Sequence, residues 1–184
     1  MDALELLQQR VSAGRLVAPA PTAEQREVLF QAAMRAPDHK LLRPWRFLTV
    51  EGERLRALGE LFAEAAQHQG GEVDPAVLEK ARNNPLRAPL VVVAIACLRA
   101  HPKVPPSEQL LAAGCAAHSL LLAAYAQGIG GMWRSGELSF SPHVAKGLGL
   151  AVNEQIIGFI YLGTPEKPAR PAAPVELAPF VSPW

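Results

Sequence analysis

The sequence is poor in cysteine and in aromatic residues, and it lacks the motifs that these residues often form. Only two cysteines occur among 184 residues, Cys97 and Cys115, and neither belongs to a C-x-x-C pair. Two isolated cysteines exclude a disulfide scaffold and a cysteine-rich zinc site. Because both lie in apolar segments, we expect free, buried thiols in a reducing cytoplasm.

An excess of charge of one sign is also missing. The formal net charge is +1, and no run of five or more like charges occurs. This excludes a basic arm or a global field that would attract nucleic acid, so any anion site must be local. The first residues, MDALELLQQR, lack the basic start and apolar centre of a signal peptide. We therefore expect a cytoplasmic protein with no nucleic-acid partner.

The longest apolar stretch covers residues 110–127. It is rich in alanine and is interrupted by His118 and Ser119, so we expect it to fall short of a membrane-spanning helix and to be buried in protein. Because it is apolar nearly all round, a small domain can hide it only at its centre or against a second copy of itself. The sequence thus predicts a homodimer and no membrane partner.

The composition is typical of a globular protein, with 49% apolar residues. The length suits a single domain over residues 1–184. Helical spacing predicts helices over residues 2–10, 22–35, 52–67, 75–82, 107–127 and 141 to 147 or 149. Apolar and β-branched runs predict strands over residues 46–50, 89–97, 130–133 and 155–162. The run 89–97 is uninterrupted, as in a strand buried on both faces. Together these elements predict an α+β fold with a sheet of four or five strands.

Several predicted helix ends carry specific signals. Thr22, followed three residues later by Gln25, forms a capping box. Ser107 is the expected N-cap of the long helix, and Gly128 is its expected end. The pair 70–71 is Gly-Gly, which we expect to break the preceding helix.

The last twenty residues, 165–184, contain six prolines, which disfavour a helix or a central strand. We expect an extended tail. Its apolar residues, among them Val175, Leu177 and Phe180, are too many for a solvated linker. The tail is therefore expected to pack along a surface, and the surface of a partner subunit is one option.

Motifs for hydrolytic, metal and nucleotide chemistry are absent. The sequence contains no G-x-S-x-G, no H-E-x-x-H and no G-x-x-x-x-G-K-[ST]. The glycines at 128–131 lack the third glycine of a dinucleotide fingerprint, because position 133 is Trp133. Cys115 and His118 share a helix face, but no further ligand lies near them in sequence, so a core histidine is favoured over a metal site.

Cations collect at predicted helix ends. Arg10 and Ser12 follow the first helix, and Arg35, His39 and Lys40 follow the second. Arginine forks and short turns rich in serine or glycine suit a phosphate group, which favours a phosphorylated cofactor. The alternative is that these cations only complement helix dipoles, worth about 0.3 to 1 kcal/mol each. Residue types and spacing leave both interpretations open.

Residues 34–47, MRAPDHKLLRPWRF, resemble the A-P-S-x-x-N-x-Q-P-W-x-F signature of the nitroreductase family of FMN enzymes. Three further segments are similar to that family in the same order along the chain. They are Arg10, Ser12 and Arg15 near the N-terminus, the glycine turn at 130–136, and the closing strand at 158–165 that ends in L-G-T-P. The likeness covers essentially the whole chain and is greatest to the short members of the family.

The resemblance implies a nitroreductase-like fold: a mostly antiparallel sheet flanked by helices, in an intertwined homodimer with an extended C-terminal tail. It implies FMN as the cofactor, bound at the subunit interface, with no metal and no catalytic side chain. The residues implied for FMN are Arg10, Val11, Ser12, Arg35, His39, Gly131, Met132 and Trp133. Those implied for the nicotinamide and substrate side are Leu121, Leu122, Ala123, Ala124, Tyr125 and Ala126.

Three positions depart from the family pattern. Val11 stands where many members have a second arginine, Leu41 replaces an asparagine, and Arg43 replaces a glutamine. Either Asp38 or His39 would take the place of the family serine, and Asp38 has the alternative role of a turn residue with no cofactor contact. We expect Lys40 and Arg43 to be surface charges.

The activity implied by the resemblance is ping-pong hydride transfer. NADH or NADPH would reduce the flavin, and a small electron-poor acceptor such as a nitroaromatic or a quinone would then reoxidise it. Two alternatives remain at this level: a non-catalytic FMN-binding or storage protein, and a relative that destroys flavin or removes halogen.

Overall fold

The structure, a computed structural model, describes residues 2–68, 73–168 and 170–184. The helices are α1 (Ala3–Gln9), α2 (Ala23–Ala33), α3 (Glu53–Gln67), α4 (Pro75–Asn83), α5 (Pro106–Ala126), α6 (Glu137–Phe140) and α7 (Pro142–Gly147), with short 3-10 turns η1 (His39–Leu41) and η2 (Pro85–Arg87). The strands are β1 (Leu16–Val17), β2 (Trp45–Glu51), β3 (Leu90–Cys97), β4 (Gly130–Arg134) and β5 (Glu154–Pro165). The α+β prediction is confirmed. The predicted break at residues 70–71 lies outside the described residues.

The five strands form one antiparallel sheet, with β5 as its longest member. The strand order is β1-β5-β3-β2, and β4 also pairs with β5. Leu16 and Val17 pair with the last two residues of β5, and β4 pairs with residues 159–163. This arrangement confirms the predicted antiparallel sheet and places β1 and the start of β4 at the same end of β5.

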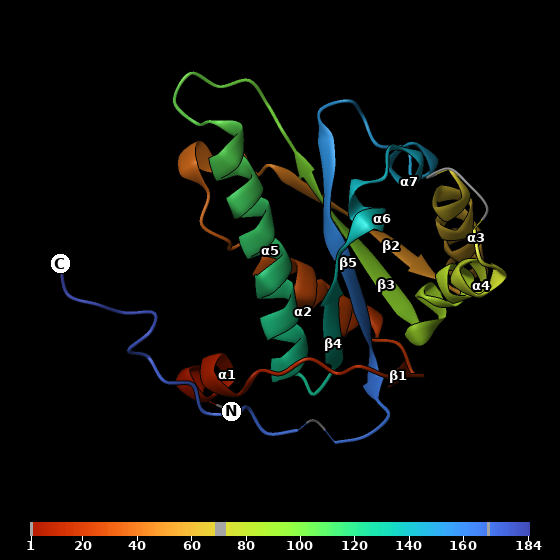
Figure 1. Ribbon diagram of the computed structural model, residues 1–184. Helices are drawn as coiled ribbons and strands as arrows, with labels where there is room; N and C mark the ends of the chain where they lie inside the picture. Colours follow the sequence, from red (N-terminus) through yellow and green to blue (C-terminus); the bar gives the residue numbers. More distant parts are fainter. Residues whose placement is uncertain (1, 69–72, 169) are drawn as a thin grey trace.

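Helices cover both faces of the sheet (Figure 1). Helices α2 and α5 pack on one face, and α3, α4, α6 and α7 lie on the other. Strand β3 is at the centre and, as predicted, is buried on both sides, because alternate side chains of a strand point to opposite faces. Val92 and Ala94 face α5, whereas Val91 and Val93 face α3.

Helix α5 presents mainly small side chains to the sheet, among them Ala113, Ala116 and Ala117. Its opposite side is exposed and carries Cys115 and His118. The predictions of a buried Cys115 and a core histidine are therefore wrong for the single chain. The uniformly apolar sequence could not show which side of the helix faces the sheet.

By length and composition α5 also meets the criteria for a helix that could cross a membrane, contrary to the expectation from its alanine content. The alanine-rich side of α5 packs on the sheet, as expected of a core helix.

The predicted capping box of α2 is present. The Gln25 N–H donates to Thr22 Oγ1 at 3.2 Å, and the Thr22 N–H donates to Gln25 Oε1 at 2.9 Å. The predicted cap of α5 is wrong, because Pro105 occupies the N-cap position in place of Ser107. Proline suits the first helical turn because its fixed φ matches the helix, and Pro106 takes that place here.

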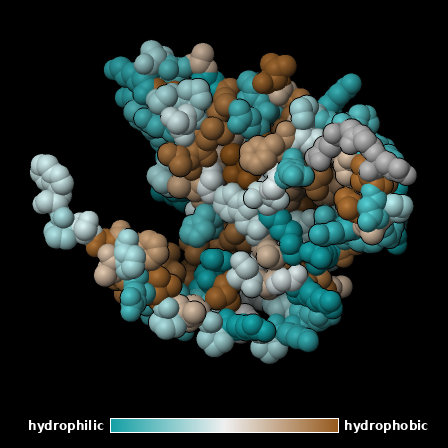
Figure 2. Space-filling view, in the orientation of Figure 1, coloured by the Kyte–Doolittle hydropathy of each residue, from teal (hydrophilic) through white to brown (hydrophobic). Residues whose placement is uncertain are grey.

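The C-terminal part of the chain differs from expectation at its start. Pro165 belongs to β5 and pairs with Leu16; proline is tolerated there because the pairing is at a strand end. Strand β1 itself was not predicted. From Glu166 onward the described residues form no helix or strand, and Phe180 and Trp184 are exposed. Figure 2 shows hydrophobic surface over α1 and the adjoining tail.

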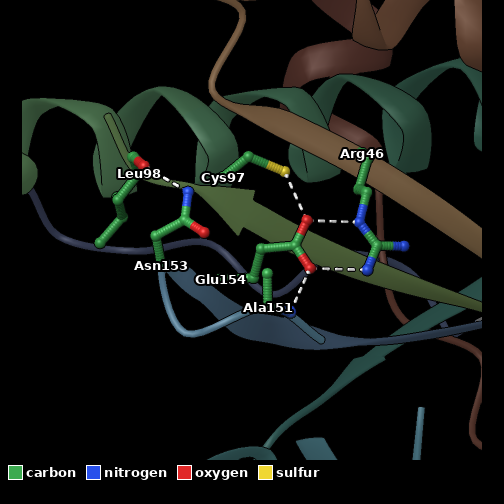
Figure 3. Close-up of polar contacts among 6 residues, drawn as sticks. All are labelled: Arg46, Cys97, Leu98, Ala151, Asn153 and Glu154. Atoms are coloured by element: carbon green, nitrogen blue, oxygen red, sulfur yellow. Dashed lines mark hydrogen bonds and ion pairs between the residues drawn. The ribbon is translucent and has the colours of Figure 1, made fainter. Parts of the chain in front are cut away.

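A polar cluster ties three strands together at one end of the sheet (Figure 3). Arg46 of β2 donates to Glu154 of β5 through two bonds of 2.6 and 2.7 Å, and Cys97 Sγ of β3 lies 3.4 Å from Glu154 Oε1. The hydrogen bonds from Arg46 lower the pKa of Glu154 to about 2. Burial, together with the nearby Glu154 carboxylate, raises the pKa of Cys97 to about 11. Cys97 is therefore a protonated structural thiol.

Candidate cofactor site

The loop that follows α1 runs beside β4. The Ala13 N–H donates to the Gly131 carbonyl at 3.0 Å, which extends the sheet edge by one backbone hydrogen bond. Two sets of residues predicted to hold the cofactor are therefore neighbours: Val11 and Ser12 of the loop, and the β4 set that begins at Gly131. A link of this kind between distant segments needs a folded sheet and leaves no local signal in the sequence.

A cavity of about 740 Å³ lies between this loop and the start of the tail. Its lining includes Ser12, Arg15, Lys167 and Arg170. The one acid in the lining is Glu166, whose carboxylate is 3.8 Å from the Arg15 guanidinium.

Three cations, a hydroxyl and the backbone of a short glycine-containing turn form a donor set that fits a phosphate dianion. Lys167 and Arg170 were missed from the sequence, where their only signal is two cations directly after the closing strand. Arg10 is half-buried at the end of α1 and is not part of this lining.

The glycine at 131 sets how closely β4 approaches α5. A Cβ built at Gly131 would lie 2.7 Å from Leu121 Cδ2, which is closer than real Cβ contacts. Gly131 and Leu121 therefore lie against each other. Trp133 packs with the core on the α5 side, whereas Met132 packs with the core on the α3 side.

The residues predicted for the nicotinamide and substrate side form the last turns of α5. Leu121 and Ala124 are buried in the core. The other four reach the surface at least in part: Leu122, Ala123, Tyr125 and Ala126. Among the predicted six, these four can meet a ligand.

The segment of Asp38 to Arg43 adopts an unusual backbone. Lys40, Leu41 and Arg43 have φ angles of 64°, 52° and 47°, in the left-handed region that disfavours residues with a Cβ by about 1 to 2 kcal/mol each. The Arg43 N–H donates to the Asp38 carboxylate at 2.5 Å, which gives Asp38 a local turn role. Strained backbone of this kind clusters at functional sites.

His39 and Arg35 are exposed, and His39 lies at the N-terminal end of α5. Its Nδ1 is 2.8 Å from Glu108 Oε2 in the first turn of that helix. Lys40 and Arg43 are exposed as expected.

The predicted site residues fall into two groups at opposite ends of α5 (Figure 1). His39 neighbours Glu108 at one end, and Gly131 neighbours Leu121 at the other. With a rise of about 1.5 Å per residue, these two points of the helix are about 20 Å apart. Within one chain the two groups cannot flank the same ring system.

No cluster of three or more histidine, cysteine or acidic side chains that could hold a metal ion occurs in the described part of the chain.

Comparison with known proteins identifies the class. The sequence profile of the Nitroreductase family matches residues 7–164. The chain therefore belongs to the Nitroreductase family. YdjA of Escherichia coli (strain K12), a candidate NAD(P)H nitroreductase, is 45% identical to it over 183 residues, which cover 99% of each chain.

Solved structures agree in fold. A nitroreductase-like family protein from Bacillus cereus has a TM-score of 0.83 at 20% identity, over 100% of this chain and 96% of that one. A mutant of NfnB, an FMN and NADPH-dependent nitroreductase from Sphigopyxis sp. strain HMH, has a TM-score of 0.78 at 17% identity, over 99% and 98% of the two chains. These likenesses confirm the predicted nitroreductase-like fold.

Proposed function

We propose that this protein is an FMN-dependent oxidoreductase that uses NADH or NADPH to reduce small electron-poor acceptors such as nitroaromatics or quinones. The observation that carries the proposal is the cationic cavity beside β4, where Ser12 of the predicted phosphate site lies with Arg15, Lys167 and Arg170. A phosphorylated cofactor suits this lining better than a neutral metabolite, because its three cations are close to one acid only.

The roles of the residues follow from their positions. Arg15, Lys167 and Arg170 would neutralise the FMN phosphate, and the Ser12 hydroxyl would donate to one of its oxygens. Gly131 has no side chain, which lets Leu121 of α5 lie directly against β4, beside the loop that holds Val11 and Ser12. When bound, FMN would supply the two-electron redox chemistry, and the protein would supply binding and orientation.

The proposal includes a homodimer. Leu111, Cys115 and His118 are exposed on the outer side of α5, and none of the three carries a carboxylate. A second copy packed here would cover the apolar side chains. It would also bring Arg35 and His39 of one chain toward Val11 and Ser12 of the other, whereas within one chain His39 and Gly131 lie at opposite ends of α5.

The two substrates would use the same open face in turn, as in a ping-pong reaction. The surface-reaching residues of the last turns of α5, such as Leu122 and Tyr125, would form the apolar wall against which NAD(P)H and then the acceptor lie. A wall of small and apolar side chains with few polar groups discriminates weakly among flat aromatic molecules.

Anaerobic reduction tests the function. The purified protein should be yellow, NADH or NADPH should bleach the flavin band, and a quinone added afterwards should restore it. A yellow protein whose spectrum does not change on addition of either nucleotide would support the storage function instead. A protein that binds no FMN would contradict both.

A further inference from the structure

The first turn of α5 holds two neighbouring segments through consecutive side chains, Glu108 and Gln109. Glu108 Oε2 lies 2.8 Å from His39 Nδ1 of η1. Gln109, only 1% exposed, accepts the Arg99 N–H at 2.9 Å and donates to the carbonyls of Arg99 and Val104 at 2.8 and 3.1 Å. These three bonds fix the loop after β3 against α5. The turn that carries Glu108 is therefore a rigid support for His39.

The backbone of η1 is also held in place. The Asp38 carboxylate accepts the Arg43 N–H, and the Asp38 carbonyl accepts the Leu41 N–H at 3.2 Å, so that the turn closes around His39. The contact with Glu108 then fixes the side-chain torsions of His39. Because the two side chains are 48% and 45% exposed, an ion pair between them contributes little to stability. What the contact determines is the orientation of the imidazole ring.

The contact also determines which ring nitrogen of His39 carries the hydrogen. An ionised carboxylate accepts hydrogen bonds and does not donate them, so Nδ1 carries the hydrogen that Glu108 accepts. The ring geometry points Nε2 away from Glu108, and Nε2 has no hydrogen-bond partner in the described part of the chain. In the neutral ring this Nε2 is an acceptor. An imidazole without such a partner mostly carries its hydrogen on Nε2 instead.

We propose that Glu108 is a positioning residue of the flavin site, which holds His39 as the Nδ1–H tautomer and presents Nε2 as an acceptor to FMN. The inference rests on the proposed function, in which His39 of one chain meets the FMN held by the other. Matching donors on FMN are the ring N3–H and the ribityl hydroxyls. The opposite tautomer would turn an N–H toward these donors and lose the hydrogen bond.

The alternative role of Glu108 is that of any acid in the first turn of a helix, which interacts favourably with the helix dipole. Glu53 has the same place in the first turn of α3, and its side chain is 93% exposed. Glu53→Ala is therefore the matched control for Glu108→Ala. Both variants remove a first-turn carboxylate, but only Glu108→Ala removes the partner of His39.

Nitrogen-15 NMR of the full-length, FMN-loaded protein, labelled at its five histidines, reads the tautomer directly. Spectra are recorded at about pH 8.5, where histidine is ordinarily neutral, and His39→Ala identifies the His39 signals. His39 should be the Nδ1–H tautomer in the wild type and in Glu53→Ala, and should shift toward Nε2–H in Glu108→Ala. Glu108→Gln should restore part of the Nδ1–H signature, because its amide oxygen can still accept. An Nε2–H tautomer in the wild type, or an unchanged signature in Glu108→Ala, would overturn the proposal.

The dissociation constant of FMN, measured from the change in flavin fluorescence on binding, gives the second readout. Glu108→Ala should weaken FMN binding about threefold to tenfold, as for one lost hydrogen bond, and should remain a dimer. In a His39→Ala background, Glu108→Ala should have no further effect, because Glu108 acts only through His39. Additive losses, or a monomeric Glu108→Ala protein, would overturn the proposal.

The same measurement separates this inference from the proposed function. A wild-type protein that binds no FMN would contradict the proposed function itself. Tight FMN binding that is weakened by His39→Ala but not by Glu108→Ala would leave the proposed function standing and overturn only the role of Glu108.

Discussion

Arg46 and Glu154 join the two strands on either side of β3 through a pair of parallel hydrogen bonds, 2.6 and 2.7 Å long. The paired geometry orients both side chains and holds the ends of β2 and β5 in register with Cys97 of the central strand. The same carboxylate accepts the Ala151 N–H at 2.9 Å and so fixes the turn before β5.

Glu154→Gln should lower the free energy of unfolding by about 1 to 3 kcal/mol at pH 7, the range for a lost hydrogen bond to a charged group. Because the pKa of Glu154 is lowered to about 2 in the folded protein, its contribution is present above the ordinary carboxyl range and is lost as the pH falls toward 2. Urea unfolding at several pH values measures this.

The control for that prediction is Glu53→Gln, because Glu53 has a 93% exposed side chain. It should change stability by less than about 0.5 kcal/mol. A difference between wild type and Glu154→Gln that stays constant down to pH 2 would contradict the role assigned to the pair.

Leu41→Gly should leave the free energy of unfolding unchanged or raise it by up to about 1 kcal/mol. Leu41 is 77% exposed and has a φ of 52°, so glycine would relieve strain and give up little buried surface. Val152→Gly is the matched control, since Val152 is exposed but is not among the residues with positive φ. The free energy of unfolding of Val152→Gly should fall by about 0.5 to 1 kcal/mol. Equal losses in both variants would argue against strain at Leu41.

Lys167→Gln combined with Arg170→Gln should weaken FMN binding by about tenfold to a hundredfold, because two charge-assisted contacts to the phosphate are lost. The flavin released on ultrafiltration measures the effect. The Lys146→Gln variant, which changes an exposed cation of α7 that does not line this cavity, should retain FMN like the wild type. Full retention of FMN in the double variant would show that the phosphate does not lie in the cavity between the loop after α1 and the start of the tail.

Leu111→Glu should dissociate the dimer. Leu111 is 70% exposed in one chain and lies on the outer side of α5, so a charge there would be buried against a second copy. Analytical ultracentrifugation reports the mass, and Val77→Glu on α4 serves as the control at a half-exposed valine of the opposite layer. Cys115 should react slowly with a thiol reagent in the wild type and rapidly in Leu111→Glu. A wild-type monomer with a reactive Cys115 would contradict the dimer.

Local signals in the sequence were sufficient for most of the fold. The capping box at Thr22 was predictable because it depends on residues three apart, and β3 was predictable because an uninterrupted apolar run suits a strand buried on both faces. Strand β1 was not predictable, since Leu16 and Val17 form a strand only by pairing with the end of β5.

The candidate site was predictable only in part, and for a similar reason. Ser12 could be named from its motif, but Lys167 and Arg170 join it only because the strand before them ends beside the N-terminal loop. The orientation of α5 was also hidden, because residues such as Cys115 and Ala116 have similar polarity although the first is exposed and the second is buried.

That two copies of the chain together build each FMN site is tested most directly by native mass spectrometry of the purified protein. The expected species is a dimer carrying two FMN molecules, and Leu111→Glu should yield monomers without FMN. A monomer that retains a full complement of FMN, in the wild type or in the variant, would contradict a site shared between two chains.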